Sequence, residues 1–158
     1  MERESGLKEF YRRLDELYRL RCIEGLLSWD QQVCMPEGGA GGRADQLEIM
    51  GRLVHHKFTD PAFHRLVNDL WEAQERLSDD DRVNVRETKR LLDRAMKLPE
   101  DFIAEKTREA SVSYVTWTQA RPENDFAAVR PHLEKLVELS RREADLVGHK
   151  DSPYDALL

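Results

Sequence analysis

The stretch Leu27-Ser-Trp-Asp-Gln-Gln-Val-Cys-Met-Pro-Glu-Gly-Gly-Ala-Gly-Gly-Arg-Ala-Asp-Gln46 separates two charged, amphipathic segments and differs from both in composition. It holds four of the eight glycines of the chain, together with a proline and a Trp-Asp pair. Because glycine reaches positive φ at little steric cost, we expect Gly38, Gly39, Gly41 and Gly42 to build an irregular loop. Ordering such a loop costs conformational entropy, which indicates a geometric role for it.

The segment before the glycines has the periodicity of an α-helix. Apolar residues recur at three- and four-residue steps, which predicts a helix over residues 5–28. At its end the polar stripe gives way to Cys22, Ile23, Leu26 and Leu27, so we expect this end to enter the protein interior. Met35-Pro36 then disfavours helix, since proline restricts the residue before it.

Five further helices follow from periodicity and from start and stop signals. Asp60-Pro61 is typical of a helix start, with Asp60 as N-cap and Pro61 at the first helical position. Ser78 followed by Asp79, Asp80 and Asp81 is a second start, because carboxylates favour the positive end of a helix dipole. The predicted helices run from about 44 to about 58, from 61 through 77, from Ser78 through 95, from Leu98-Pro99 to about 120, and from 131 through 144, with a short turn at 126–130 and Gly148 as a C-terminal cap.

No window alternates apolar and polar residues over five or more positions, so we predict no substantial sheet. The fold class is therefore all-α, with about six helices in successive antiparallel hairpins that form one domain over residues 1–158. We expect residues 148–158 to be an interrupted segment, since they restart at a proline and stop on two leucines.

Charge and composition exclude several classes of function. The net charge of −6 argues against nucleic acid or an anionic membrane as a partner held by bulk charge. No apolar run approaches the ~20 residues of a membrane span, and the first residues lack a signal-peptide pattern. The only two cysteines, Cys22 and Cys34, have no framework spacing and are typical of reduced thiols. We expect a cytoplasmic protein.

The residues offer no catalytic or metal-binding set. A helical zinc site needs His-Glu-x-x-His, and no pair of histidines in this chain has that spacing. A metal site at His55, His56 and His64 is the alternative, but adjacent histidines diverge by about 100° on a helix, which favours ordinary surface histidines. Ser28 and Ser152 have no neighbouring base, and neither cysteine lies in a Cys-x-x-Cys or Cys/His arrangement. We assign no catalytic residue and no metal ligand.

Three residues of the glycine-rich stretch are candidate substrate contacts. Trp29 stands beside Asp30 at the mouth of the predicted loop, and Arg43 and Gln46 begin the next helix. Arg43 and Gln46 can present a cation and an amide to a peptide. The alternative is structural, because an Arg in a loop often braces it: Arg43 would then hold Glu37, Asp30 or loop carbonyls.

Several ungapped blocks, in order along the chain, resemble the N-terminal region of the carboxypeptidase Taq family of zinc metallocarboxypeptidases. The blocks cover essentially the whole sequence and are Leu27-Ser-Trp-Asp30, Met35-Pro-Glu-Gly-Gly-Ala40, Arg43-Ala-Asp-Gln46, Asp93-Arg-Ala-Met-Lys-Leu-Pro99, Trp117-Thr-Gln-Ala-Arg121, Asp125-Phe126, Pro131-His-Leu-Glu-Lys-Leu-Val-Glu-Leu139, Arg142-Glu-Ala144 and Pro153-Tyr-Asp-Ala-Leu-Leu158.

The resemblance implies an almost entirely helical enzyme that uses zinc or a similar divalent ion to remove residues from peptide C-termini. In that family the His-Glu-x-x-His helix, the third metal ligand and the groups that hold the substrate carboxylate lie beyond the matched region. We therefore expect this chain to form a wall or lid of the cleft and to be inactive alone, with a C-terminal catalytic portion as its missing partner. Whether the chain itself counts as an enzyme stays open.

The alternative is a stand-alone helical module that binds a peptide or a protein. A segment that lacks its surroundings should expose apolar surface, so such a module would self-associate, for example as a homodimer.

Overall fold

The computed structural model describes the backbone of residues 2–157, and within that range it contains six α-helices and no strand, as the sequence predicts. The helices are α1 (Glu2–Val33), α2 (Ala40–Phe58), α3 (Pro61–Glu72), α4 (Asp79–Ala95), α5 (Glu100–Glu123) and α6 (Phe126–Val147). Three short 3-10 segments lie between or after them: η1 (Glu37–Gly39), η2 (Gln74–Arg76) and η3 (Pro153–Leu157).

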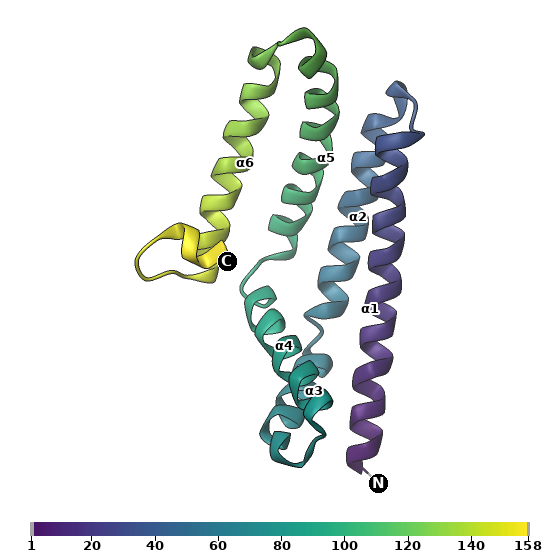
Figure 1. The fold of residues 1–158 in the computed structure, drawn as a ribbon, viewed down its shortest axis with the longest axis vertical. Coiled ribbons are helices and arrows are strands. Elements are labelled where there is room, and N and C mark those ends of the chain that lie inside the picture. Colours follow the sequence, from purple (N-terminus) through teal and green to yellow (C-terminus); the bar gives the residue numbers. More distant parts are fainter. Residues whose placement is uncertain (1, 158) are drawn as a thin grey trace.

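The four long helices stand side by side in the order α6, α5, α2, α1, and the α3–α4 hairpin lies at one end of this layer (Figure 1). The chain runs up α1, down α2, through α3 and α4, up α5 and down α6, so neighbours in the layer are antiparallel (Figure 1). None of the helices in the described part is both long enough and apolar enough to cross a membrane.

The main hydrophobic cluster lies where α1 and α2 meet the α3–α4 hairpin. Phe10 and Phe63 are fully buried and stack with ring centroids 6.2 Å apart. Val67, Val85 and Leu92 complete the centre of this cluster. Burial of large apolar side chains is the dominant favourable term in folding, so this cluster contributes strongly to the stability of the fold.

The predicted helix caps are confirmed. Asp60 accepts a hydrogen bond from the backbone N–H of Phe63 (2.9 Å), and Ser78 accepts one from the N–H of Asp81 (3.2 Å). Gly148 has φ +87° and donates its N–H to the carbonyl of Ala144, as a C-terminal cap requires. These side chains and backbone groups satisfy N–H and C=O groups that helix ends otherwise leave unpaired.

The glycine-rich stretch is more helical than expected. α1 continues past Ser28 to Val33, and α2 begins at Ala40, so Gly41 and Gly42 lie inside a helix. Gly148 is the described glycine with positive φ, so the four glycines of this stretch do not use that conformational freedom, and the expected irregular loop is shorter than predicted. After Ser28, the first residues that strongly disfavour a helix are Met35 and Pro36. Nothing between residues 29 and 33 ends the helix, so α1 extends to Val33.

Gly39 is the member of the run where close approach matters. A Cβ at this position would stand 3.0 Å from Cγ of Met35, which lies on the other side of the connection. Gly38, Gly41 and Gly42 have no neighbour within 4 Å of an added Cβ. The tight turn between α1 and α2 therefore depends on Gly39 and Pro36.

Two further expectations are corrected. The 126–130 segment is the first turn of α6, which Asp125 caps through the N–H of Ala128, and Pro131 lies inside the helix. Ala127 is exposed, so the carbonyl that Pro131 leaves without an N–H partner can bond to water. Cys22, Ile23 and Leu26 are exposed on α1 rather than buried.

Candidate functional site

Arg43 holds the end of α1 against the start of α2. Its guanidinium lies 2.5 Å from Asp30 Oδ2, donates to the carbonyl of Leu27, and donates through Nε to Gln46 Oε1 at 2.9 Å. The Arg43 side chain is 13% exposed. The guanidinium carries five N–H donors in one plane, and three acceptors lie around it. This geometry favours a structural role, in which Arg43 holds α1 against α2.

The three candidate contact residues do not converge on one cavity. Gln46 is exposed and bonded to Arg43, so its oxygen is already used. Trp29 is 54% exposed. It lies on the side of α1 that turns away from α2, about 160° around the helix from Gln31, which faces α5. Arg43 and Gln46 are thus brought together, whereas Trp29 stands on another face.

A groove between α1 and α5, with both polar and apolar side chains in its lining, is a candidate surface for an extended peptide. It encloses about 410 Å³ and is lined by Ser28, Gln31, Gln32, Ser111 and Tyr114, among others. The Gln31 amide donates to Ser111 Oγ at 2.9 Å and to its carbonyl at 3.1 Å. Amides and hydroxyls can exchange hydrogen bonds with a peptide backbone. Sequence reasoning missed this pair, which is separated by 80 positions.

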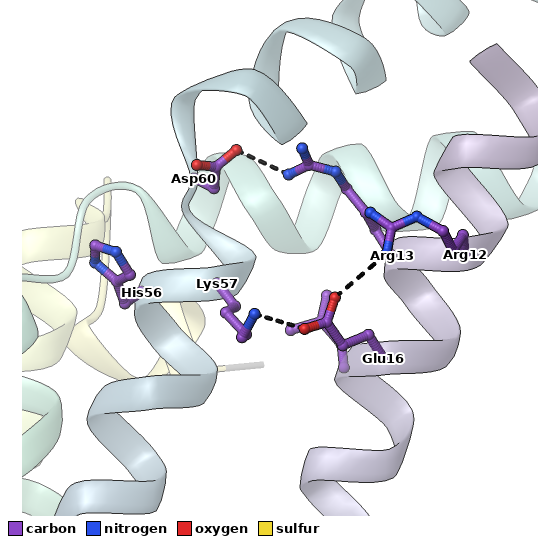
Figure 2. A pocket seen from close by; sticks show the side chains of 7 residues that line it. Arg12, Arg13, Glu16, His56, Lys57 and Asp60 are labelled. Atoms are coloured by element: carbon purple, nitrogen blue, oxygen red, sulfur yellow. Dashed lines mark hydrogen bonds and ion pairs between the residues drawn. The ribbon is translucent and has the colours of Figure 1, made fainter. Parts of the chain in front are cut away.

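A charged pocket lies between α1 and the junction of α2 with α3 (Figure 2). It has a volume of about 260 Å³ and is lined mainly by Arg12, Arg13, Glu16, Lys57 and Asp60. Arg13 Nη1 lies 2.8 Å from Asp60 Oδ1, and Lys57 Nζ lies 2.5 Å from Glu16 Oε1. The cations are already paired, so the pocket offers little free charge to a ligand.

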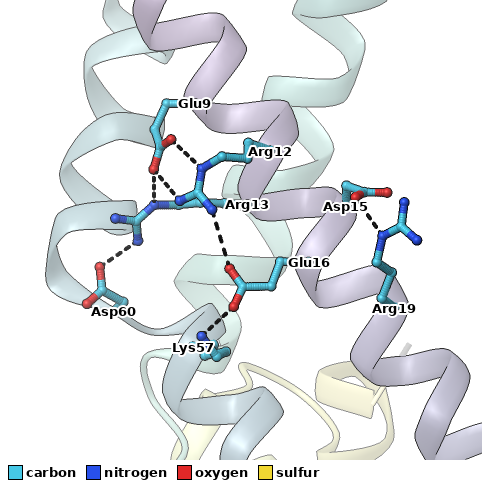
Figure 3. A network of polar contacts seen from close by, with 8 residues as sticks. All are labelled: Glu9, Arg12, Arg13, Asp15, Glu16, Arg19, Lys57 and Asp60. Carbon is cyan, nitrogen blue, oxygen red and sulfur yellow. Dashed lines mark hydrogen bonds and ion pairs between the residues drawn. The ribbon is translucent and has the colours of Figure 1, made fainter.

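Glu9 extends this network along α1 (Figure 3). It accepts from Arg12 Nε at 2.6 Å and from Arg13 Nε at 2.9 Å, and these hydrogen bonds lower the pKa of Glu9 to about 2. The hydrogen bond and charge of Lys57 lower the pKa of Glu16, and the N–H of Phe63 together with Arg13 lowers that of Asp60. Such exposed pairs contribute little each, and their joint effect is to fix α1 against α2 and α3.

Glu143 on α6 is the most buried charge in the described part of the chain. It accepts from Lys106 on α5 and from Arg94 on α4, the latter at 3.3 Å. Burial alone would raise the pKa of Glu143, but the hydrogen bonds and charges of Lys106 and Arg94 together lower it. One carboxylate thereby ties three helices together.

Glu109, His132 and Thr116 form a second contact between α5 and α6. His132 Nδ1 lies 2.7 Å from Glu109 Oε1, and its Nε2 lies 3.3 Å from Thr116 Oγ1. An acid, a histidine and a hydroxyl in this order have the composition of a nucleophile triad. Thr116, however, also donates to the carbonyl of Val112 within its own helix. The backbone N–H groups inside a helix are used by its own ladder, so no oxyanion site is available.

The histidines do not form a metal site. Among residues 5–156, whose side chains the structure describes, no three His, Cys, Asp or Glu side chains stand close enough together to hold a metal ion. His55 lies against the turn at Leu98, where burial lowers its pKa. His56 approaches Glu100 (3.6 Å), and His64 lies near Asp93 (3.9 Å). The alternative of a shared site at His55, His56 and His64 is therefore wrong.

Comparison with known proteins agrees with this fold. The chain is 32% identical to thermostable carboxypeptidase 1 of Thermus thermophilus, covering 98% of the chain and 32% of that protein. It is 29% identical to thermostable carboxypeptidase 1 of Pyrococcus furiosus, covering 96% of the chain and 30% of that protein. The chain thus spans about a third of the length of these relatives.

Solved structures show the same likeness. The crystal structure of BsuCP matches 97% of the chain and 31% of its own length, with a TM-score of 0.93 at 27% identity. The M32 carboxypeptidase from Deinococcus radiodurans R1 matches 96% of the chain and 30% of its own length, with a TM-score of 0.74 at 30% identity. The chain thus shares its all-α fold with about a third of each of these proteins, which places it in an all-α class that includes carboxypeptidases.

Within that class, the chain belongs to the carboxypeptidase Taq (M32) metallopeptidase family, whose model matches residues 9–158. The matched region is the N-terminal part of the family, as the sequence blocks predicted.

Proposed function

We propose that this chain forms a helical wall or lid of the peptide cleft in a metallocarboxypeptidase, and that it shapes access to the cleft without cleaving the peptide. The observation that carries the proposal is the match of nearly the whole chain, at a TM-score of 0.93, to about a third of BsuCP. In this role the groove with Gln31 and Ser111 would face peptide, Arg43 would hold the corner between α1 and α2, and Gln46 would contact peptide beside that corner. Trp29, on another face of α1, would contact only substrate that extends beyond the groove.

The chain alone should not hydrolyse peptides. Its sequence nowhere contains His-Glu-x-x-His, and its described residues offer no three-donor group for a metal. A peptidase needs a metal-activated water or an activated nucleophile. Zinc or a similar divalent ion, which would polarise the scissile carbonyl and activate water, is implied for the intact enzyme by the family. We expect its ligands outside these 158 residues.

Complementation tests the proposal. The chain would be mixed or co-expressed with the part of the Bacillus subtilis carboxypeptidase 1 that lies beyond the matched region, with zinc present. Release of C-terminal amino acids from a short peptide would be measured for each part and for the mixture. We expect turnover only in the mixture. Zinc-dependent release by the chain alone would refute inactivity, and a well-folded mixture without turnover would count against the cleft role.

A second candidate function, a stand-alone helical module that associates with itself, is favoured by the surface area. The protein exposes 10366 Å², whereas a compact monomer of 18.5 kDa exposes about 8,200 Å². The excess of about 2,000 Å² on one chain is more than the ~800 Å² that each partner buries in a standard interface, so the surface has room for a covering partner. Cytoplasmic residence suits either function, because the exposed thiols of Cys22 and Cys34 would stay reduced there.

A further inference from the structure

A cavity of about 470 Å³, here called the end pocket, lies over one side of α2 and is lined by residues of α1, α2, α4 and α5. Because α2 lies between α1 and α5 in the layer, a cavity that all three helices line must lie over α2 (Figure 1). Its apolar lining consists mainly of Val54, Phe58, Leu91, Leu98 and Ile103. Cavities of this volume, within about 300–1,000 Å³, are typical of small-molecule sites.

The inner part of the end pocket is apolar and preformed. Val54 belongs to the main hydrophobic cluster, and Phe58 packs against that cluster, so the packing of the fold fixes both side chains. Leu91 is 44% exposed, although it lines the same pocket. A ligand with an apolar body would remove this surface from water, which is favourable in proportion to the area covered.

Two arginines of the lining, Arg21 and Arg94, supply positive charge. Arg21 is exposed and has no ion-pair partner in the described part of the chain. Arg94 donates to Glu143 at 3.3 Å, which uses one of the five N–H donors of its guanidinium. Glu24 is the carboxylate of the lining, and burial lowers the pKa of His55, which favours its neutral form. Two cations and one anion leave a net positive charge, so the end pocket favours an anion.

Arg21 lies on the side of α1 that faces α5. Arg21, Glu24, Ser28 and Gln31 follow one another at steps of three, four and three residues, which places them on one face of the helix. Gln31 donates to Ser111 of α5 at 2.9 Å, so this face of α1 looks across α2 to α5. Arg21 is therefore held beside the apolar lining, where a free guanidinium can pair with a ligand.

We propose that the end pocket binds a small carboxylate with an aromatic or branched apolar body. The carboxylate pairs with Arg21 and Arg94, and the apolar body covers Leu91. This site goes beyond the cleft role, which concerns peptide in the neighbouring groove, and does not depend on it. A free apolar amino acid and a carboxylic acid without an amino group share this chemistry. Glu24 can accept a hydrogen bond from the ammonium group of the amino acid.

Nuclear magnetic resonance on the isotope-labelled full chain locates the site. The probe is hydrocinnamate, which carries a phenyl ring on a short carboxylic acid chain. We expect saturable shifts of backbone amide signals centred on Val54, Ala95 and Leu98. No saturable shift up to the solubility limit of the probe overturns the proposal. Shifts centred on Gln31 and Ser111 instead would place the probe in the groove and would also overturn it.

Variants test the charge and the apolar wall separately. Arg21→Gln should weaken hydrocinnamate binding about five-fold through loss of an ion pair, whereas the matched control Arg19→Gln, on the same helix, should not. Leu91→Asn should weaken it about three-fold through loss of apolar contact, whereas Val83→Asn, 45% exposed on the same helix, should not. All four positions are exposed, so the amide spectra should show an intact fold. Binding that Arg21→Gln leaves unchanged, or that Arg19→Gln weakens equally, overturns the proposal.

Two further probes distinguish the sources of the carboxylate. Phenethylamine has the apolar body without the carboxylate and should not bind, and binding equal to that of hydrocinnamate would overturn the role of the arginines. Phenylalanine adds an ammonium group to hydrocinnamate. Tighter binding of phenylalanine, lost in Glu24→Gln, identifies a free amino acid as the ligand. Tighter binding of hydrocinnamate identifies an acid without an amino group, and either order supports a carboxylate site.

Discussion

Gly51 on α2 lies directly against Thr107 on α5: a Cβ at position 51 would stand 2.8 Å from Thr107 Oγ1. The buried residues on either side, Ala44 and Ala104, are also small. The packing of α2 against α5 thus depends on the Gly51 backbone lying directly against the Thr107 side chain, with no room for a methyl group at position 51.

Gly51→Ala should therefore destabilise the protein although alanine favours helix. Overpacking costs about 1–3 kcal/mol and the helix gains about 1 kcal/mol, so we expect a net loss of about 1 kcal/mol in the free energy of unfolding. Urea denaturation measures it. Gly41→Ala, where the added Cβ meets nothing, is the matched control and should be neutral or stabilising. If Thr107→Ala fails to restore the Gly51→Ala variant, the contact is not the cause.

Arg43→Ala should lower stability by about 1–3 kcal/mol, because Asp30 and the Leu27 carbonyl lose a donor in a half-buried corner. Arg43→Lys should recover only part of the loss, since an ammonium lacks the guanidinium fork. Arg90→Ala, on the exposed side of α4, is the control and should change stability by less than about 0.5 kcal/mol. Turnover of a complemented enzyme should be unaffected by Arg43→Lys. Lost turnover at unchanged stability would instead make Arg43 a substrate contact.

Stability should fall in acid through Glu143. The pKa of Glu143 is lowered in the folded protein from an ordinary value of 4.5, so its contribution is present above pH 4.5 and is lost as the pH falls through the lower folded value. Glu143→Gln should be less stable than the wild type at pH 7 and should lose less stability below pH 4.5. Unfolding at a series of pH values from 7 to 2 measures both. Glu134→Gln, an exposed position on α6, should keep the acid slope of the wild type.

His132→Ala should loosen α6 from α5 and cost about 1 kcal/mol, because it removes the contact with Glu109. Thr116→Val should change stability less, since the Thr116 hydroxyl also bonds the Val112 carbonyl of its own helix at 3.2 Å and its contact with His132 is longer than the His132–Glu109 contact. Hydrogen exchange of α6 amides would show the difference between the two variants. Esterase or peptidase activity that Thr116→Val abolishes would instead establish a catalytic hydroxyl and overturn our structural interpretation.

Local signals in the sequence predict most of the fold. Asp60-Pro61, Ser78 and Gly148 act within one helical turn, so their effects could be read from neighbouring residues. The sequence-based predictions were wrong where a residue type is compatible with more than one backbone conformation. Glycine permits positive φ without requiring it, and Pro131 can lie inside an exposed helix as well as at its start.

The candidate site was predictable only in part. Asp30 could be named as a partner of Arg43 because only 13 positions separate them. Glu143 and Arg94 are 49 positions apart, and Gln31 and Ser111 are 80 apart. Nothing in a single sequence specifies which faces of distant helices will meet, because that depends on how all the helices pack.

The single layer of α1, α2, α5 and α6 also determines how the stability of the protein depends on ionic strength. Water reaches both broad sides of such a layer, so most of its ion pairs lie within reach of dissolved ions and are screened at physiological salt. The apolar cluster at the α3–α4 end is buried and carries no charge, so dissolved ions do not weaken its packing. Added salt should therefore weaken the ion pairs along the layer, including Arg13–Asp60 and Lys57–Glu16 near the α3–α4 end, while the apolar packing of Phe10 against Phe63 holds.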